Sequence, residues 1–398
     1  MTSYQYLIVG AGMTADAAAR GIREVDPKGS IGVIGNEAHR PYDRPPLSKK
    51  LWTGTPEEKI WRAEITPPVS FHLGRTVREI DPAAKQVVDD AGQGYQYERL
   101  LLATGGTPRR LPLPEDDRIV YFRTLDDYHR LRHLTESGNR FAVIGGGFIG
   151  SEIAAALSMN GKEVVMVFPG EGIGNKVYPK DLSQFIDGYY QEKGIELMPH
   201  HKAVSAEIRA GRLVLFAEHR STGARREVVV DGIVVGVGIE PNIALAEAAG
   251  LEVGDGVPVD ARLRTSDPNI YAAGDVAAAQ VPALGRRMRI EHEDNANTMG
   301  RLAGRSMAGA EVDYTHLSYF YSDLFDLGYE AVGELDTRLQ TVEQWDEPFR
   351  KGVVYYLGEG RVRGVLLWNV WDQVDAARRL IEAPGPFGAE DVKGRLPA

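Results

Sequence analysis

The chain has 398 residues, and its 46 lysines and arginines against 56 aspartates and glutamates give a formal net charge of -10. At roughly 100 to 200 residues per domain, this length allows two or three domains with sizeable cores. The negative charge disfavours a protein that coats nucleic acid or binds acidic lipid. The absence of cysteine excludes structural disulfides, thiolate metal ligands and cysteine-based catalysis.

The start of the chain shows neither a targeting segment nor a membrane span. No stretch of the sequence approaches the roughly 18 consecutive apolar residues that cross a bilayer. No cationic segment precedes the first apolar run, and the earliest charge in the chain is Asp16. We therefore expect a cytoplasmic protein with no nucleic acid and no membrane as partner.

The first forty residues have the pattern of a nucleotide-binding unit. A short apolar strand over 6–9 leads into a Gly-x-Gly-x-x-Ala turn over 10–15, and an alanine-rich helix follows over 17–22. A second strand is predicted over 31–34. The two glycines permit a tight turn and close approach of the backbone to a pyrophosphate, which then meets a helix N-terminus.

The end of that second strand is where a ribose-binding acid belongs. Asn36 and Glu37 both stand there, and the sequence leaves the choice between them open, since an amide replaces part of what a carboxylate accepts. A solvated loop without a ligand is the alternative interpretation.

The same pattern returns 135 residues later. A strand over 141–144 precedes Gly-Gly-Gly-Phe-Ile-Gly at 145–150, then a helix to Met159 and a strand over 164–168. One such match is weak, but two in the same context predict two dinucleotide-binding units. After the second unit's strand come Gly170 and Glu171 with no arginine nearby in sequence for a 2'-phosphate, which favours NADH over NADPH.

The remaining segments complete the predicted organisation. Residues 100–106 form a buried-type strand ending in small residues, and residues 108–114 are typical of a linker. From about Tyr314 the chain has aromatic-rich strands and a helix over 375–381, which predict a third, α+β domain. The tail after Glu382 is rich in proline and glycine, and we expect it to be loosely held.

Three motifs carry a family resemblance. They are Arg-Pro-Tyr-Asp-Arg-Pro-Pro-Leu-Ser-Lys at 40–49, Ala-Thr-Gly-Gly at 103–106 and Ala-Gly-Asp at 273–275. Taken alone, the first could be a rigid surface turn with cations aimed at a pyrophosphate. Together they resemble the FAD-dependent pyridine nucleotide reductases of the ferredoxin and rubredoxin reductase type, and Leu-Leu-Trp-Asn at 366–369 is similar to apoptosis-inducing factor in particular.

The resemblance implies an α/β fold with two Rossmann-like domains of the glutathione reductase type and a C-terminal α+β domain. The implied boundaries are 1–108 with 242–313 for the FAD domain, 109–241 for the NAD domain and 314–398 for the C-terminal domain. It implies FAD and NADH as cofactors, with NADPH less favoured.

The resemblance also assigns cofactor-binding residues, one motif at a time. For FAD it implies Gly10, Ala11, Gly12, Met13, Thr14, Asn36 or Glu37, Arg44, Lys49, Val77, Thr104, Gly105, Arg123, Asp275, Glu291 and His292. For NAD it implies Gly145, Gly147, Phe148, Ile149, Gly150, Glu152, Gly170 or Glu171, Lys176, Gly238, Tyr321, Glu330 and Asn369.

Two positions depart from the family pattern, and one histidine needs a separate interpretation. Asn36 stands where relatives place the ribose acid, and Tyr321 replaces a tryptophan near the nicotinamide. His292 is interpreted as a structural residue at the flavin edge, because its acidic neighbours show no metal-ligand spacing. We expect no metal.

Three residues are candidates for the chemistry that the cofactors carry. Phe148, directly after the second glycine-rich turn, is a candidate gate for nicotinamide, and helix–sheet packing is its alternative. Glu152 lies one helical turn further on the same face, where the resemblance implies a carboxylate paired with Lys49. An exposed glutamate and a solvated lysine are the alternatives.

Two functions remain open at the level of sequence. The first is an oxidoreductase that passes electrons from NADH through FAD to a ferredoxin, rubredoxin, quinone or other small acceptor. The second is a redox-sensing protein resembling apoptosis-inducing factor, whose NADH-reduced charge-transfer state controls dimerisation or partner binding. A homodimer is compatible with both.

Overall fold

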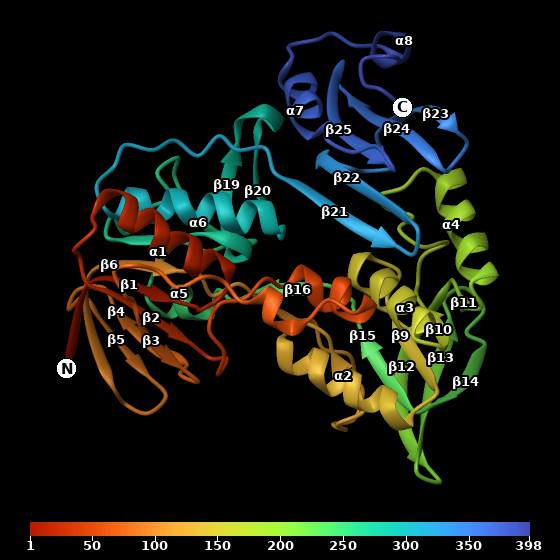
Figure 1. Cartoon of the computed structure of the whole chain (residues 1–398), viewed down its shortest axis with the longest axis horizontal. Helices are drawn as coiled ribbons and strands as arrows, with labels where there is room; N and C mark the ends of the chain where they lie inside the picture. The colour runs from red at the N-terminus through yellow and green to blue at the C-terminus, as the bar shows by residue number, and fades with distance from the viewer. The chain divides into compact units, whose positions relative to one another are not determined.

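The computed structural model describes residues 1–398, and the chain forms two compact units (Figure 1). The first unit consists of residues 1–44, 57–107 and 240–320, and the second consists of residues 45–56, 108–239 and 321–398. Each unit is therefore discontinuous in sequence. No helix of the structure is both long and apolar enough to cross a bilayer.

The first unit is built on a sheet with strand order β3-β2-β1-β6-β5-β4, in which β18 also pairs with β6. Its central strands β3, β2, β1, β6 and β18 are parallel, and the apolar runs 6–9, 31–34 and 100–102 lie on β1, β2 and β6. The strands are β1 (Thr2–Val9), β2 (Ile31–Gly35), β3 (Ser70–Leu73), β4 (Val77–Asp81), β5 (Gln86–Asp89), β6 (Gly94–Leu102) and β18 (Ile270–Ala272).

A smaller sheet and three helices complete the first unit. The sheet has the order β17-β19-β20, formed by β17 (Val257–Pro258), β19 (Ala277–Val281) and β20 (Arg286–Arg289). The helices are α1 (Met13–Val25), α5 (Ala244–Ala248) and α6 (Glu293–Met307). The short strands β7 (Gly106–Pro108) and β16 (Ile239–Pro241) stand where the chain leaves and re-enters this unit.

Helices α1 and α6 lie side by side with their backbones in near contact (Figure 1). A Cβ atom on Gly304 would lie 1.9 Å from the carbonyl oxygen of Ala18, and one on Gly21 would lie 2.1 Å from that of Arg301. Such distances leave no room for any side chain, so glycine is required at these positions. The glycines thus fix α1, and with it the first glycine-rich turn, against a helix from the other end of the unit.

The second unit contains a parallel sheet with the order β11-β10-β9-β15-β8. The strands are β8 (Ile119–Tyr121), β9 (Arg140–Ile144), β10 (Glu163–Val167), β11 (Glu196–Met198) and β15 (Gly232–Val235), with helices α2 (Leu125–Ser137), α3 (Phe148–Met159) and α4 (Lys180–Glu192). An antiparallel sheet of β12 (His201–Arg209), β13 (Arg212–His219) and β14 (Arg225–Val230) follows β11.

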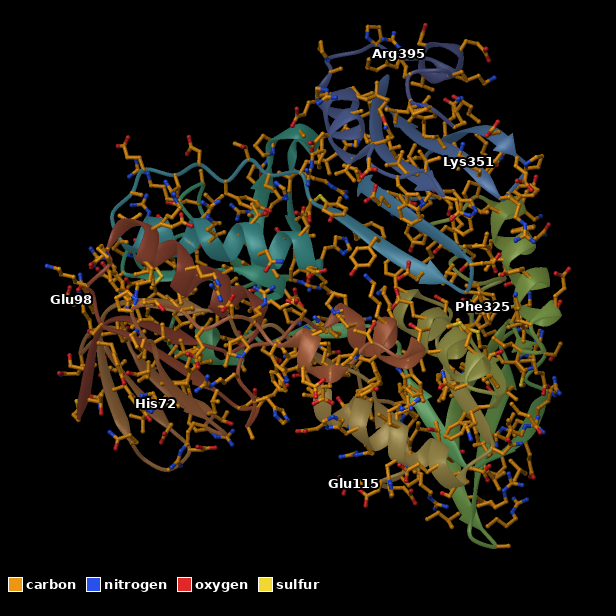
Figure 2. All side chains as sticks on the ribbon, viewed as in Figure 1. His72, Glu98, Glu115, Phe325, Lys351 and Arg395 are labelled. Atoms are coloured by element: carbon orange, nitrogen blue, oxygen red, sulfur yellow. The ribbon has the colours of Figure 1, made fainter.

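The C-terminal part of the second unit is an antiparallel sheet with the order β21-β22-β25-β24-β23. Its elements are β21 (Tyr319–Leu324), β22 (Leu327–Gly333), β23 (Gln340–Glu347), β24 (Lys351–Gly358), β25 (Arg361–Trp368), α7 (Val374–Glu382) and α8 (Ala389–Val392). Phe325, labelled in Figure 2, lies at the β21–β22 turn, and its ring is 5.2 Å from Tyr190 and 5.8 Å from Tyr189 of α4. These rings attach the C-terminal sheet to the nucleotide-binding part of its own unit.

One sequence-based expectation differs from the structure. The tail after Glu382 is not loosely held: Val392 and Leu396 are buried, and the Leu396 amide donates to the Tyr355 hydroxyl at 3.2 Å. Residues 45–56 belong to the second unit although both flanking segments belong to the first. In both cases buried apolar residues explain the position of the segment. Val392 and Leu396 hold the tail, and Leu51 and Trp52 hold residues 45–56, each within the second unit. The division into three domains stays a prediction.

Candidate dinucleotide sites

The first glycine-rich turn joins β1 to α1. Gly10 has φ +112°, and a Cβ atom there would lie 2.1 Å from the carbonyl oxygen of Ala103. Gly12 is the N-cap of α1 and no side chain caps the helix, so the first amides of α1 are available to an anion. A Cβ atom on Gly12 would meet only the Arg44 guanidinium, at 3.9 Å. The predicted residues Ala11, Met13 and Thr14 complete this turn.

A polar cluster of Glu37, Tyr42 and Arg44 lies beside this turn, and it includes only one of the two candidate ribose-binding residues. Both carboxylate oxygens of Glu37 have partners: Oε1 accepts from Arg44, and Oε2 accepts from the Tyr42 hydroxyl at 2.5 Å. Asn36, in contrast, is exposed. Glu37 therefore orients Arg44 beside Gly12, a role that the sequence pattern did not suggest. Which of the two binds ribose remains a prediction.

Several other predicted residues of the first unit follow the carboxyl ends of β18 and β6. Gly274, with φ +76°, faces Thr14, and Asp275 follows it in a short 3-10 helix. The Thr104 hydroxyl donates to the Asn242 carbonyl at 3.0 Å, and the Asn242 side chain donates back to the Thr104 carbonyl at 2.8 Å. Thr104 and Gly105 are thus fixed by Asn242, which was not among the predicted residues. Val77 is buried at the start of β4.

His292 is the N-cap residue of α6, and its ring stacks on Phe320 with centroids 4.3 Å apart. Burial lowers the pKa of His292 to about 4, although Asp275 and Asp294 act in the opposite direction. The imidazole is therefore neutral at pH 7, as suits a group at the positive end of a helix. Its predicted neighbour Glu291 is exposed and pairs with Arg289 at 2.5 Å.

The second glycine-rich turn joins β9 to α3 and repeats the geometry of the first. A Cβ atom on Gly145 would lie 2.3 Å from the Gly236 carbonyl oxygen, and one on Gly150 would lie 2.1 Å from that of Gly145. Gly147 caps α3 without a side-chain bond, and a Cβ atom there would meet nothing within 4 Å. Phe148 is half-buried and Ile149 is 38% exposed. The turn therefore presents open space to a pyrophosphate.

A buried ion pair lies one helical turn beyond the second turn. Glu152 of α3 accepts on Oε2 from Lys49 Nζ at 2.8 Å and from the Ser48 hydroxyl at 2.6 Å. Its Oε1 accepts from the Ser322 hydroxyl at 2.6 Å, and Lys49 Nζ lies 5.2 Å from the centroid of the Tyr321 ring. The side chains of Lys49 and Glu152 are 8% and 2% exposed, so the alternative of two solvated residues is wrong.

The surroundings of this ion pair are apolar and aromatic. Tyr178, Tyr329 and Trp368 are fully buried, and their ring centroids are 5.7 to 5.8 Å apart. Burial raises the pKa of Tyr178, with a smaller contribution from Glu152, and the phenol stays neutral. Burial likewise raises the pKa of Asp323, which Lys49 partly offsets. The pair therefore operates at low dielectric, where a fixed charge has a strong effect.

Glu330 lies on β22 of the C-terminal sheet, and Asn369 directly follows the neighbouring strand β25. Asn369 has φ +49°, and its side chain bridges two segments by accepting from Gly328 N and donating to the Arg350 carbonyl, each at 2.8 Å. Glu330 Oε2 is buried without a hydrogen-bond partner. Burial, reinforced by Asp372, raises the Glu330 pKa. An orphaned acceptor of this kind suits the amide donor of a ligand.

Four other predicted positions are placed with less detail. Arg123 precedes the N-cap of α2 in the second unit, and its amide donates to Asp127 at 3.1 Å. Gly238 has φ +92° with open space at its Cβ position, whereas Glu171 and Lys176 are exposed. The cofactor contacts of all the predicted residues stay predictions.

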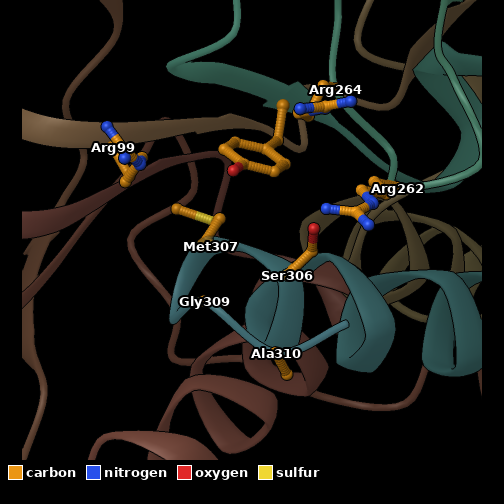
Figure 3. A pocket seen from close by; sticks show the side chains of 8 residues that line it. Arg99, Arg262, Arg264, Ser306, Met307, Gly309 and Ala310 are labelled. Carbon is orange, nitrogen blue, oxygen red and sulfur yellow. The ribbon is translucent and has the colours of Figure 1, made fainter. Parts of the chain in front are cut away.

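A separate hollow of about 180 Å³ in the first unit is lined by arginines (Figure 3). Arg99 approaches it from one side, Arg262 and Arg264 of a second segment approach it from the other, and Ser306 and Met307 at the end of α6 form its floor. The glycine-rich turn contacts α6 at Gly300, nearer its beginning. Arg264 is also neutralised by Asp260 at 2.7 Å. This hollow is therefore distinct from the dinucleotide site.

Comparison with known proteins agrees with this geometry. The profile described as pyridine nucleotide-disulphide oxidoreductase matches residues 4–300, which contain both glycine-rich turns. The chain belongs to this family. A second profile, the C-terminal region of mitochondrion-associated apoptosis-inducing factor, matches 303–348 and 343–383. The family name mentions a disulphide, but this member has no cysteine and so cannot use one.

Curated relatives include both kinds of protein that the resemblance named. The ferredoxin–NAD(+) reductase component of an anthranilate 1,2-dioxygenase system from Burkholderia cepacia is 34% identical over 96% of this chain and 95% of the relative. Apoptosis-inducing factor 1 from Dictyostelium discoideum is 30% identical over 95% of this chain and 78% of the relative. A Drosophila melanogaster relative of that name is 31% identical, and this chain spans 63% of its length.

Solved structures share the fold over nearly the whole chain. A ferredoxin reductase from Rhodopseudomonas palustris superimposes with a TM-score of 0.89 at 28% identity, over 98% of this chain and 96% of that one. Putidaredoxin reductase, in its covalent complex with putidaredoxin, superimposes with a TM-score of 0.87 at 28% identity, over 96% of this chain and 94% of that one. The predicted fold class is confirmed. The protein is an FAD-dependent oxidoreductase that uses NADH, as predicted.

Proposed function

We propose that this protein is a ferredoxin–NAD(+) reductase, which takes a hydride from NADH and passes electrons singly to a small ferredoxin-type protein. The observation that carries the proposal is the presence, in one chain, of two uncapped helix N-termini behind glycine-rich turns. Two such turns suit two dinucleotides. Relatives named as ferredoxin reductases over nearly the whole chain supply the acceptor class.

The residues of the second unit would bind and orient the nicotinamide dinucleotide. The open backbone at Gly147 would receive the pyrophosphate, and Glu330 Oε2 would accept a hydrogen bond from the carboxamide. Lys49, held by Glu152, would present a fixed positive charge. FAD, when bound, supplies the conversion between two-electron hydride transfer and one-electron steps.

Phe148 keeps its proposed role as a gate for nicotinamide. Its half-buried side chain follows the exposed Gly147, so rotation about its side-chain bonds would open or cover the turn. Packing of the same ring between helix and sheet remains the competing role. A Phe148→Leu variant separates the two: a gate alters the NADH association rate, whereas a packing residue lowers the unfolding temperature alone.

Anaerobic stopped-flow mixing with NADH, followed by reoxidation, tests the proposal. We expect rapid bleaching of the yellow protein and reoxidation by ferredoxin that is faster than by oxygen or quinone. Lys49→Met should slow bleaching about tenfold or more, since positioned charges contribute on that scale. Lys50→Met is the matched control, because Lys50 is the exposed neighbour. Reoxidation by quinone alone would contradict the ferredoxin assignment.

The redox-sensing alternative is favoured by one observation, the match of residues 303–348 to the C-terminal region of apoptosis-inducing factor. The same experiment distinguishes it. Slow bleaching with a persistent long-wavelength charge-transfer band would support redox sensing. A homodimer that depends on NADH would appear in sedimentation velocity runs with and without the reductant. Cytoplasmic location remains our expectation.

A further inference from the structure

The loop after β10 is the place where a Rossmann-type unit distinguishes its two nicotinamide cofactors. An acid at this position binds the ribose 2'-hydroxyl of NADH, whereas a nearby arginine accommodates the 2'-phosphate of NADPH. In this chain the loop runs through Pro169 and Gly170 to the exposed Glu171. From sequence alone, the acid has no competing arginine.

The fold brings an arginine to this loop from fifty residues further along. Arg220 Nη1 donates to the carbonyl oxygen of Pro169 at 3.1 Å. The Arg220 amide also donates to the carbonyl of His200 at 2.8 Å, and the His200 amide donates to that of Gly170 at 2.9 Å. Backbone bonds from two separate turns, β11–β12 and β13–β14, therefore hold Arg220 next to Pro169 and Gly170.

The charges around Arg220 leave its guanidinium available to a ligand. A guanidinium has five N–H donors, and one of them is used on the Pro169 carbonyl. The nearest acid on the same hairpin, Glu218, is already paired with Lys202 at 3.4 Å and with Arg225 at 3.1 Å. Arg220 itself is exposed and takes part in no ion pair.

We infer that Arg220 gives the second dinucleotide site an affinity for the 2'-phosphate of NADP(H), so that the enzyme binds NADPH as well as NADH. Arginine suits this role because its planar donors match a phosphate in a bidentate manner. Glu171 opposes it by repelling the phosphate and favouring the free hydroxyl. This inference deepens the proposed function and rests on the second unit binding a nicotinamide dinucleotide.

Equilibrium titration of the FAD-loaded protein with NAD+ and NADP+, followed by isothermal calorimetry, tests the inference without turnover. Arg220→Gln should weaken NADP+ binding about tenfold and leave NAD+ binding nearly unchanged, as expected for loss of one charged hydrogen bond. The fragments 2',5'-ADP and 5'-AMP should show the same contrast. Arg225→Gln removes the same charge from the same hairpin and serves as control.

The outcomes separate the inference from the proposed function. If NAD+ binds and NADP+ does not, or if Arg220→Gln and Arg225→Gln affect NADP+ equally, the role of Arg220 is overturned. If neither dinucleotide binds, the second unit is not a nicotinamide site and the proposed function fails with the inference. Glu171→Gln should strengthen NADP+ binding about threefold through removal of a like charge; no gain would remove Glu171 from the argument and count against the inference.

Discussion

The two glycine-rich turns have the same backbone plan but different surroundings. In both, the first glycine packs against a neighbouring carbonyl and the second caps a helix without a side-chain bond. In the first turn, Gly12 is half-buried beside Arg44, which Glu37 and Tyr42 hold in place. In the second, Gly147 is exposed and faces open space.

This difference corresponds to two kinds of cofactor. A pre-oriented cation beside the first turn adds a charge-assisted contact to a pyrophosphate and favours a resident group. The second turn leaves open space at the Cβ position of Gly147, which suits a dinucleotide that must enter and leave in each cycle. The same glycine-rich sequence pattern therefore suits a cofactor that stays bound in the first unit and a dinucleotide that exchanges in the second.

The largest expected effect comes from the glycine that packs against a carbonyl. Gly10→Ala should lower the free energy of unfolding of the first unit by at least about 3 kcal/mol, because its Cβ would overlap Ala103 and φ is positive. Urea unfolding and the ratio of flavin to protein absorbance measure the change. Gly147→Ala should keep its fold and its flavin but bind NAD+ more weakly. Equal loss of flavin in both variants would remove the distinction.

The next effect concerns the acid on the helix after each turn. Asp16 of α1 pairs with Arg20 and Arg62, and Arg20 is 37% exposed, whereas the partner of Glu152 is a lysine only 8% exposed. Glu152→Ala should therefore cost about 3 to 5 kcal/mol, because it leaves a buried charge unpaired. Asp16→Ala should cost less, since Arg20 reaches water and Arg62 keeps Asp43 and Asn297 as partners.

Urea unfolding of both variants checks this order. The double variant Lys49→Met with Glu152→Leu should regain most of the loss, because no charge stays buried. A double variant as unstable as Glu152→Ala alone would show that the cavity, and not the unpaired charge, dominates.

Acid should weaken the first unit through His292. Its pKa in the folded protein is about 4, below the ordinary value of about 6.5, so the unfolded chain binds the proton first as pH falls. Stability is thus complete above pH 6.5 and declines toward pH 4, by about 1 to 3 kcal/mol in all. His292→Gln should show a shallower decline in urea midpoints between pH 7 and pH 4.5. Parallel curves would contradict the assignment.

The smallest effect separates the two serines on Glu152. Ser322 is the hydrogen-bond donor to Oε1, whereas Ser48 shares Oε2 with Lys49. Ser322→Ala should cost about 1 to 2 kcal/mol and Ser48→Ala less, because only the former leaves a carboxylate oxygen without its donor. Thermal unfolding resolves the difference, and a reversed order would show that Lys49 does not satisfy Oε2.

Local sequence patterns predicted the two nucleotide turns well, since strand, glycine turn and helix are determined by neighbours in sequence. The predicted strand over 31–34 lies within β2, and the predicted helix over 375–381 lies within α7. Contacts between residues far apart in sequence could not be predicted from such local patterns. Neither the serines on Glu152, nor Asn242 beside Thr104, nor Arg220 beside Pro169 stands at a spacing that marks it.

The contact between α1 and α6 also sets the order in which the newborn chain can mature. Residues 1–107 leave the ribosome early, but Gly300 and Gly304, against which α1 packs, are translated roughly 10 to 40 seconds later at ordinary elongation rates. The parallel strands of the second unit end at Val235, so they are translated before α6. The packing of α6 behind the first glycine-rich turn is thus completed late in synthesis, and a chain truncated before residue 300 would lack this support.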